Sequence, residues 1–294
     1  MFVLENELLR VEVAEKGAEI KRIYHKETAT ELLWSGEKSF WGRVSPILFP
    51  IVGRVTNDAY FVDGKEYSLS QHGFARDEDF AVASQSDTEI WLELAHSEDS
   101  LAKYPFEFML RIGYVLDGAQ VSVKWEVQNQ GSATMPFSIG AHPAFNIQLQ
   151  EGDELSDYYL HLETSEKVET YLFDSENGLI KDEQEIIVPD LKLLPLSKDL
   201  FEEYPTVVLE GETAIALKSF NHDYGVEVRF DGFPYVGIWS PINGDGVVAP
   251  FVCIEPWFGM ADTKPVSGEL RDKKGIEELG AGETFAAAYS MTFQ

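Results

Sequence analysis

Glu255 stands in surroundings that suit proton transfer. It closes a predicted strand, the strictly apolar stretch 251–254, and precedes a proline. Burial disfavours the charged form of a carboxylate and raises its pKa, so a buried glutamate needs a partner or a task. A raised pKa near the working pH is also what acid/base catalysis requires. We therefore interpret Glu255 as a candidate for acid/base chemistry.

His142 is a second candidate. It lies just before Pro143, and only the small residues Gly140 and Ala141 precede it directly. Proline restricts the preceding residue to extended or turn conformations, which places the imidazole at a strand end. The small neighbours leave room for a ligand, although a buried histidine with a structural hydrogen bond is the alternative. We favour a functional role for this residue.

Three further polar residues and a tryptophan could hold a ligand. Arg54 ends an apolar stretch directly after a glycine, and His72 and Arg76 stand four residues apart around another glycine. Their side chains donate hydrogen bonds that suit hydroxyl groups. Trp257 could stack on the apolar face of a pyranose. The structural alternatives are a salt-bridged surface arginine, a loop histidine bonded to a backbone carbonyl and a core tryptophan.

Strands would have to position these residues. Apolar and polar residues alternate in the manner of half-buried strands throughout the chain. Examples are residues 9–13, 90–94, 106–112, 121–127 and 226–230. Asp63-Gly64 and Asp117-Gly118 supply the positive φ of tight hairpins. Helical signal is confined to one or two turns at 97–104 and 197–203, each behind a serine.

Length and composition favour one large globular unit. The chain has 294 residues, of which 44% are apolar and 25% charged, and these values permit a sizeable core. Because no linker, low-complexity run or repeat interrupts it, residues 1–294 are predicted to form a single domain. The predicted fold is all-β, a large antiparallel β-sandwich with a concave face on which side chains converge.

Net charge and cysteine content restrict the partners and the compartment. The formal charge is −28, from 23 basic and 51 acidic residues, so the field repels nucleic acids and anionic membranes. Cys253 is the only cysteine, which excludes an internal disulfide, and we interpret it as a small core residue. With no signal-peptide pattern and no apolar run of membrane-spanning length, we expect a cytoplasmic protein, monomeric or homodimeric.

Four motifs, taken together and in order, resemble the aldose 1-epimerase (galactose mutarotase-like) family, most nearly its LacX-type branch. They are Gly53-Arg54, His72-Gly73-Phe74, His142-Pro143-Ala144-Phe145-Asn146 and Ile254-Glu255-Pro256-Trp257. The resemblance extends over nearly the whole chain, from the first strand through residues 232–239 to the last motif. It implies the galactose mutarotase-like supersandwich, in agreement with the strand pattern.

The resemblance also implies roles. Glu255 would take the proton from the anomeric hydroxyl of a free aldohexose while His142 gives one to the ring oxygen. The ring would open, rotate and reclose as the other anomer. We expect burial to raise the pKa of Glu255, and the nearby carboxylate to favour the imidazolium form of His142. No metal or organic cofactor is implied.

The same resemblance assigns the substrate-binding residues. Arg54 and His72 would bind sugar hydroxyls, with Arg76 as a further candidate from the same loop, and Trp257 and Trp239 would form pocket wall. The family usually offers an aspartate to the sugar as well. None can be assigned within residues 199–205.

Two alternatives remain open. A hexose-6-phosphate 1-epimerase would share the fold and the acid/base pair, and Arg54 and Arg76 could hold its phosphate. A non-catalytic carbohydrate-binding protein would need the donors and aromatic rings but no acid/base pair.

Overall fold

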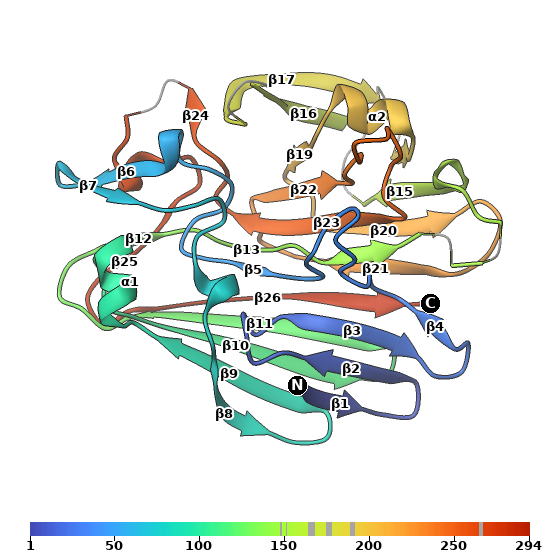
Figure 1. The fold of residues 1–294 in the computed structure, drawn as a ribbon, viewed down its shortest axis with the longest axis horizontal. Coiled ribbons are helices and arrows are strands. Elements are labelled where there is room, and N and C mark those ends of the chain that lie inside the picture. The colour runs from blue at the N-terminus through green and yellow to red at the C-terminus, as the bar shows by residue number, and fades with distance from the viewer. Residues whose placement is uncertain (148, 151, 164–167, 175–177, 189–191, 265–266) are drawn as a thin grey trace.

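The computed structural model describes residues 1–294 except 148, 151, 164–167, 175–177, 189–191 and 265–266. The described part contains twenty-six strands, two α-helices and four 3₁₀ turns (Figure 1). Every pair of named strands is antiparallel except β17 with β24. The prediction of an all-β antiparallel fold is confirmed.

The larger sheet has nine strands in the order β18-β15-β20-β21-β26-β11-β10-β9-β8. Their bounds are β8 (Ala81–Gln85), β9 (Glu89–Ala95), β10 (Phe108–Asp117), β11 (Gln120–Asn129), β15 (Tyr158–Leu162), β18 (Leu193–Pro195), β20 (Ala214–Ser219), β21 (Gly225–Arg229) and β26 (Thr284–Phe293). The predicted turn at Asp117-Gly118 joins β10 to β11, and Gly118 has a φ of 55°.

The smaller main sheet carries the residues of interest. Its order is β19-β22-β23-β13-β5, and β14 also pairs with β23. The bounds are β5 (Ile47–Leu48), β13 (Ile139–Ala141), β14 (Ala144–Asn146), β19 (Val207–Glu210), β22 (Tyr235–Trp239) and β23 (Phe251–Phe258). Strand β23 is therefore central, with neighbours along both edges.

Both faces of β23 are covered, because successive side chains of a strand point to opposite sides. Val252 and Ile254 join the main hydrophobic cluster, which also contains inward residues of the nine-stranded sheet. Cys253 and Trp257 belong to two smaller clusters on the opposite face. Glu255 lies between them on that same face. One face of β23 thus fills the sandwich core, and the other forms the floor of the site.

Shorter elements surround the two main sheets. They are the sheet β1 (Phe2–Glu5), β2 (Leu9–Val13), β3 (Ile20–His25) and β4 (Thr30–Glu31); the sheet β16 (Val168–Phe173), β17 (Ile180–Val188) and β24 (Thr263–Lys264); the pairs β6 (Ala59–Val62) with β7 (Lys65–Ser68) and β12 (Met135–Phe137) with β25 (Glu277–Leu279); the helices α1 (Glu98–Lys103) and α2 (Lys198–Glu203); and 3₁₀ turns at Thr56–Asp58, Ala75–Asp77, Leu155–Asp157 and Leu270–Asp272. In Figure 1, β16, β17 and α2 lie above β22 and β23, on the side opposite to β26, β11, β10, β9 and β8 of the large sheet.

The local predictions from turn and cap residues are confirmed. Asp63 and Gly64, with φ of 50° and 77°, connect β6 to β7. Ser97 and Ser197 cap the two helices, each accepting a bond from a backbone N–H three residues on.

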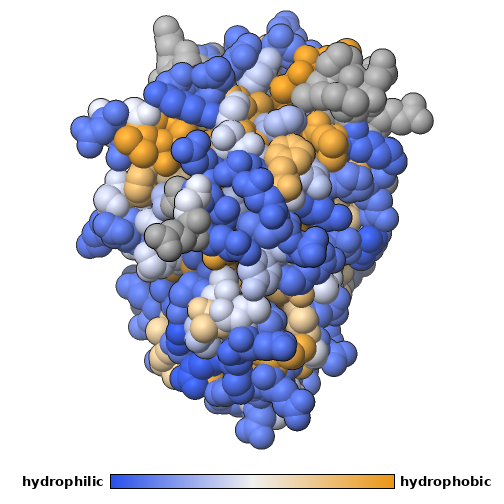
Figure 2. Space-filling model, turned by 90° about the vertical axis from the view of Figure 1, so that its right-hand side faces the viewer, coloured by the Kyte–Doolittle hydropathy of each residue, from blue (hydrophilic) through white to orange (hydrophobic). Residues whose placement is uncertain are grey.

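The surface is mainly hydrophilic on the face that Figure 2 draws. Figure 2 shows one face covered mostly by hydrophilic residues, with apolar residues gathered in patches in its upper part. Among the described helices, none has the length and apolar character needed to cross a membrane.

Candidate active site

Glu255 and His142 are in direct contact. Nε2 of His142 lies 3.3 Å from Oε2 of Glu255, and the two residues are 7% and 1% exposed. Glu255 does not end its strand as its sequence context suggests, because β23 continues through Pro256 to Phe258. The carboxylate therefore stands mid-strand, where neighbours on both sides shield it from water.

The pairing register explains why these residues meet. Strand β13 pairs Gly140 with Trp257, and β14 pairs Ala144 with Cys253. Continuing the same register across the break between β13 and β14 places His142 opposite Glu255. Pro143 interrupts the pairing there, so His142 is held at the edge of the break as its Pro-linked motif predicts.

Burial moves the two pKa values in opposite directions. It raises the pKa of Glu255 well above its usual value, and the Trp257 side chain only partly opposes this. Burial also lowers the pKa of His142 to about 3, so the expectation that a nearby carboxylate favours imidazolium is wrong. Both shifts have desolvation as their main cause, and they favour a neutral His142 beside a protonated Glu255, a state in which the pair holds one titratable proton.

Aromatic rings surround the imidazole of His142. The ring of Trp41 stacks on it, with centroids 4.6 Å apart and planes 27° from parallel. Trp239 and His72 approach it edge-on, with centroids at 5.4 Å and 5.7 Å. The stacked indole covers one face of the imidazole, and the two perpendicular rings add to its burial.

His72 is fixed by two hydrogen bonds to one glycine. Its backbone N–H donates to the carbonyl of Gly53, and its Nδ1 accepts from the Gly53 N–H at 3.1 Å. The neutral ring therefore carries its proton on Nε2. Burial first, and His142 second, hold the pKa of His72 well below the usual range. The ring thus offers a fixed donor rather than a charge.

The two arginines differ in exposure. The Arg76 side chain is 15% exposed and donates to the carbonyl of Gln71. Its buried Nε has no hydrogen-bond partner, although Oδ2 of Asp77 lies 3.9 Å away. Burial, followed by the charge of Arg43, lowers the pKa of Arg76 to about 10. Arg54 is 46% exposed, with Nη1 3.8 Å from Asp58. Arg76 is therefore a largely shielded cation, and Arg54 is an exposed one at the rim of the pocket.

Trp257 lies flat on the sheet because glycines flank it. A Cβ on Gly140 would come within 2.6 Å of its indole, and a Cβ on Gly237 within 2.4 Å. Both glycines stand on neighbouring strands, β13 and β22, so any side chain there would displace the ring. Its Nε1 is buried without a hydrogen-bond partner of good geometry.

These side chains border one pocket with a volume of about 440 Å³, within the range of small-molecule sites. All seven residues singled out in the sequence line it: Arg54, His72, Arg76, His142, Trp239, Glu255 and Trp257. They come from loops and strands up to about 200 positions apart in the chain. The pocket combines two aromatic walls, several hydrogen-bond donors and one buried carboxyl group.

A model of the aldose 1-epimerase family matches residues 1–271. The chain belongs to this family. It is 30% identical to the plasmid form of protein LacX from Lactococcus lactis subsp. lactis, over 98% of both chains. Human galactose mutarotase is 25% identical over 76% of this chain and 66% of its own length. A galactose mutarotase related enzyme from Lactobacillus acidophilus superposes with a TM-score of 0.93 at 33% identity, covering 100% of this chain and 97% of its own.

Several residues that line the pocket were not predicted from the sequence of this aldose 1-epimerase family member. They are Trp41, Gln71, Phe173, Ile180, Pro205 and Thr206. The aromatic run around Trp41, outside any alternating pattern, was the available signal. Within the described lining, Glu255 is the only carboxylate, and the 199–205 region contributes Pro205 rather than an aspartate.

Proposed function

We propose that this protein is an aldose 1-epimerase that interconverts the α and β anomers of a free aldohexose. The main support for this proposal is the 3.3 Å contact between Nε2 of His142 and Oε2 of Glu255. Both residues line a pocket large enough for a monosaccharide. The reaction needs a proton removed from one oxygen and a proton given to another. The anomeric hydroxyl and the ring oxygen are bonded to the same carbon, so acid and base must lie about this close together.

In the proposed mechanism Glu255 takes the proton of the anomeric hydroxyl and His142 donates to the ring oxygen. The C1–O5 bond breaks, and the free aldehyde forms. After rotation about C1–C2 the roles reverse, the ring oxygen loses its proton to His142, and the other anomer closes. The single proton of the resting pair passes between the two groups across their contact before the first step. No net proton is consumed.

The remaining side chains orient the sugar in this proposal. Nε2 of His72 and the guanidinium groups of Arg76 and Arg54 donate to hydroxyl oxygens. The buried Nε of Arg76, which has no hydrogen-bond partner, favours a ligand rich in acceptors. Trp257 and Trp239 contact the apolar ring face. The proposal also places the protein in the cytoplasm.

A second candidate is a hexose-6-phosphate 1-epimerase. The observation that favours it is the position of Arg54, which lines both the main pocket and an adjoining hollow of about 560 Å³. Asp58 also lines this hollow and its negative charge opposes a phosphate. We therefore place the free sugar first.

Polarimetry tests the proposal. Freshly dissolved α-D-glucose, α-D-galactose and α-D-glucose 6-phosphate are followed with and without the protein, and the spontaneous rate is subtracted. We expect acceleration for a free sugar. Acceleration of the phosphate alone would favour the second candidate, and sugar binding without acceleration would indicate a binding protein.

A further inference from the structure

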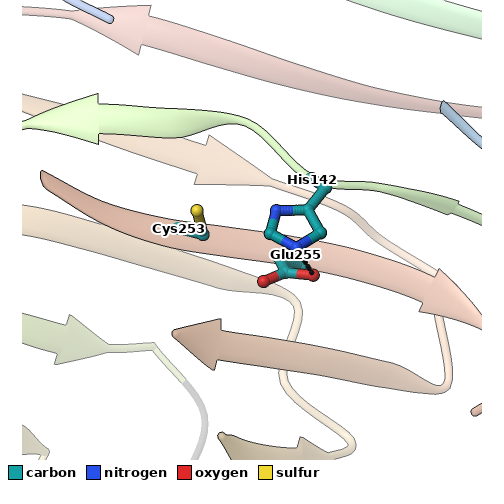
Figure 3. A group of neighbouring side chains, drawn as sticks. All are labelled: His142, Cys253 and Glu255. Atoms are coloured by element: carbon teal, nitrogen blue, oxygen red, sulfur yellow. Dashed lines mark ion pairs between the residues drawn. The ribbon is translucent and has the colours of Figure 1, made fainter. Parts of the chain in front are cut away.

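Cys253 lies beside the two proposed catalytic groups. It stands two positions before Glu255 on β23, so both side chains point to the same face of the sheet, and His142 reaches over from the break between β13 and β14 (Figure 3). One ligand atom from each of the three residues lies within 4.8 Å of the other two. All three side chains are buried.

This combination has the chemistry of a zinc site. A thiolate, an imidazole and a carboxylate are the protein ligands that Zn²⁺ prefers, and three of them leave a fourth coordination position open. Metal–ligand bonds of about 2.0 to 2.3 Å place the ligand atoms closer together than 4.8 Å. Binding of the ion would therefore draw the three side chains closer together.

The charge balance also suits a buried site. When Zn²⁺ binds, the thiol loses its proton and the His142–Glu255 pair loses the one that it shares. Zn²⁺, a thiolate and a carboxylate then sum to zero, and the neutral imidazole completes the set. A buried complex without net charge avoids the desolvation cost of an unpaired ion. The surrounding charge of −28 attracts divalent cations from solution.

A second observation points to the same place. Nδ1 of the buried His142 has no hydrogen-bond partner on another residue, although most buried polar side-chain atoms have one. An ion at this nitrogen would therefore displace no hydrogen bond to another residue. His142 and Glu255 border the pocket whereas Cys253 is not among its lining residues, so an ion would enter through the pocket on the side of His142 and Glu255.

We propose that His142, Cys253 and Glu255 form a Zn²⁺ site, and that the ion inhibits the protein by occupying both groups of the acid/base pair. The binding part of this proposal is independent of the proposed function; only the inhibition rests on it. The protein would then be active as the metal-free form and reversibly silenced by zinc.

Co²⁺ titration followed by absorbance tests binding without any activity assay. Cys253 is the only cysteine of the chain, so a thiolate-to-Co²⁺ charge-transfer band in tag-free protein can come only from this residue. We expect one equivalent of Co²⁺ to produce the band and Zn²⁺ to abolish it by displacement. Absence of the band in folded protein would overturn the proposal.

Two variants of the cysteine and one control sharpen the result. Cys253→Ala and Cys253→Ser should each weaken Zn²⁺ binding by roughly a hundredfold or more, since even outer-shell partners contribute ten- to hundredfold. His161→Gln, on β15 in the large sheet, should bind as the unaltered protein does. Equal Zn²⁺ affinity in both cysteine variants would also overturn the site.

Inhibition is measured separately, as the ratio of mutarotation rates with and without Zn²⁺ for each variant. We expect a low ratio in the unaltered protein, and a chelator should bring its rate back to the zinc-free value. In the cysteine variants the ratio should be near one. If the protein binds Co²⁺ through Cys253 but shows no mutarotation at all, the proposed function fails and the metal site stands. Mutarotation that Zn²⁺ leaves unchanged at saturating, spectroscopically verified occupancy would overturn the inhibitory role.

Discussion

The indole of Trp41 lies against the imidazole of His142, with their planes 27° from parallel. Trp41 is half-buried, and its backbone carbonyl accepts a hydrogen bond from Nε1 of Trp34 at 2.8 Å. The stacked ring shields one side of the histidine from water. We infer that Trp41 contributes to the low pKa of His142, because burial is the main cause of that shift.

Replacement of Trp41 by alanine should therefore raise the pKa of His142 toward its usual value. We expect the acid limb of the kcat/KM profile to move to higher pH and the rate at neutral pH to fall. Trp41→Phe keeps an aromatic face and serves as the control, with a smaller displacement of the limb. An acid limb at the same pH in all three proteins would contradict this role of the indole.

Glu255→Gln tests the acid/base assignment directly. The amide keeps the shape of the side chain and removes its proton exchange, so mutarotation should fall by about a hundredfold to ten-thousandfold. Burial already disfavours the charged form of Glu255, so thermal unfolding should occur at an equal or higher temperature. Polarimetry and calorimetry on the same sample measure both effects. A variant with unaltered rate would exclude Glu255 from catalysis.

The pH profile follows from the signs of the two shifts. His142 has a lowered pKa and stays unprotonated down to unusually low pH, whereas Glu255 has a raised pKa and keeps its proton to unusually high pH. The one-proton form should therefore persist over a wide plateau. We expect the acid limb well below the usual imidazole value of about 6.5, and an alkaline limb above the usual carboxyl range. These limbs belong to the coupled pair.

The measurement is kcat/KM across the pH range in which the protein stays folded, in the presence of a chelator. An acid limb at the ordinary imidazole pKa would show that His142 is charged in the resting protein. The mechanism would then begin from a different protonation state.

Gly237→Ala tests the seat of Trp257. The added methyl group would lie 2.4 Å from the indole, so the ring must move, and overpacking of this kind costs about 1 to 3 kcal/mol. We expect lower stability in urea and a higher KM. Gly244→Ala is the matched control, since a Cβ there meets nothing within 4 Å. Equal effects from both substitutions would contradict the packing argument.

Asp262 should hold the Arg54 loop in place. One carboxylate oxygen pairs with the buried Lys273 at 2.7 Å, and the other accepts from the backbone N and Oγ1 of Thr56 at 2.9 and 3.0 Å. Asp262→Asn leaves Lys273 buried without a counter-charge, which should cost about 3 to 5 kcal/mol. KM should rise as Arg54 loses its support.

A double variant separates the two effects. Asp262→Asn with Lys273→Met removes the uncompensated charge, so stability should largely return while KM stays high. Chemical denaturation and polarimetry measure the two quantities. Recovery of both together would show that Asp262 acts on stability alone.

Much of the fold was predictable because its signals are local. Alternation revealed strands such as β2 and β11, and glycine turns and serine caps located the hairpins and both short helices. The motif glycines and histidines also indicated which loops border the pocket. Each of these inferences depends on residues adjacent in the chain.

The remainder depends on contacts between distant segments. Pro256 suggests a strand end, yet pairing with Val236 carries β23 past it. The role of Trp41 cannot be predicted from its neighbours, because its stacking requires the loop to fold back over His142. The pKa shift of His142 was predicted in the wrong direction for the same reason, since the aromatic rings that desolvate the imidazole come from other parts of the chain.

The position of β23 sets a limit on motion. Its backbone amides lie in the middle of a sheet with side chains packed on both faces, so their hydrogens should exchange with solvent only when the whole molecule unfolds. The backbone that carries the Glu255 carboxylate therefore cannot unfold locally. Any backbone adjustment to a ligand must therefore come from the segment around Trp41, which is half-exposed and lies outside the sheets. The β23 face of the pocket is thus rigid, and backbone movement on ligand binding is confined to the segment around Trp41.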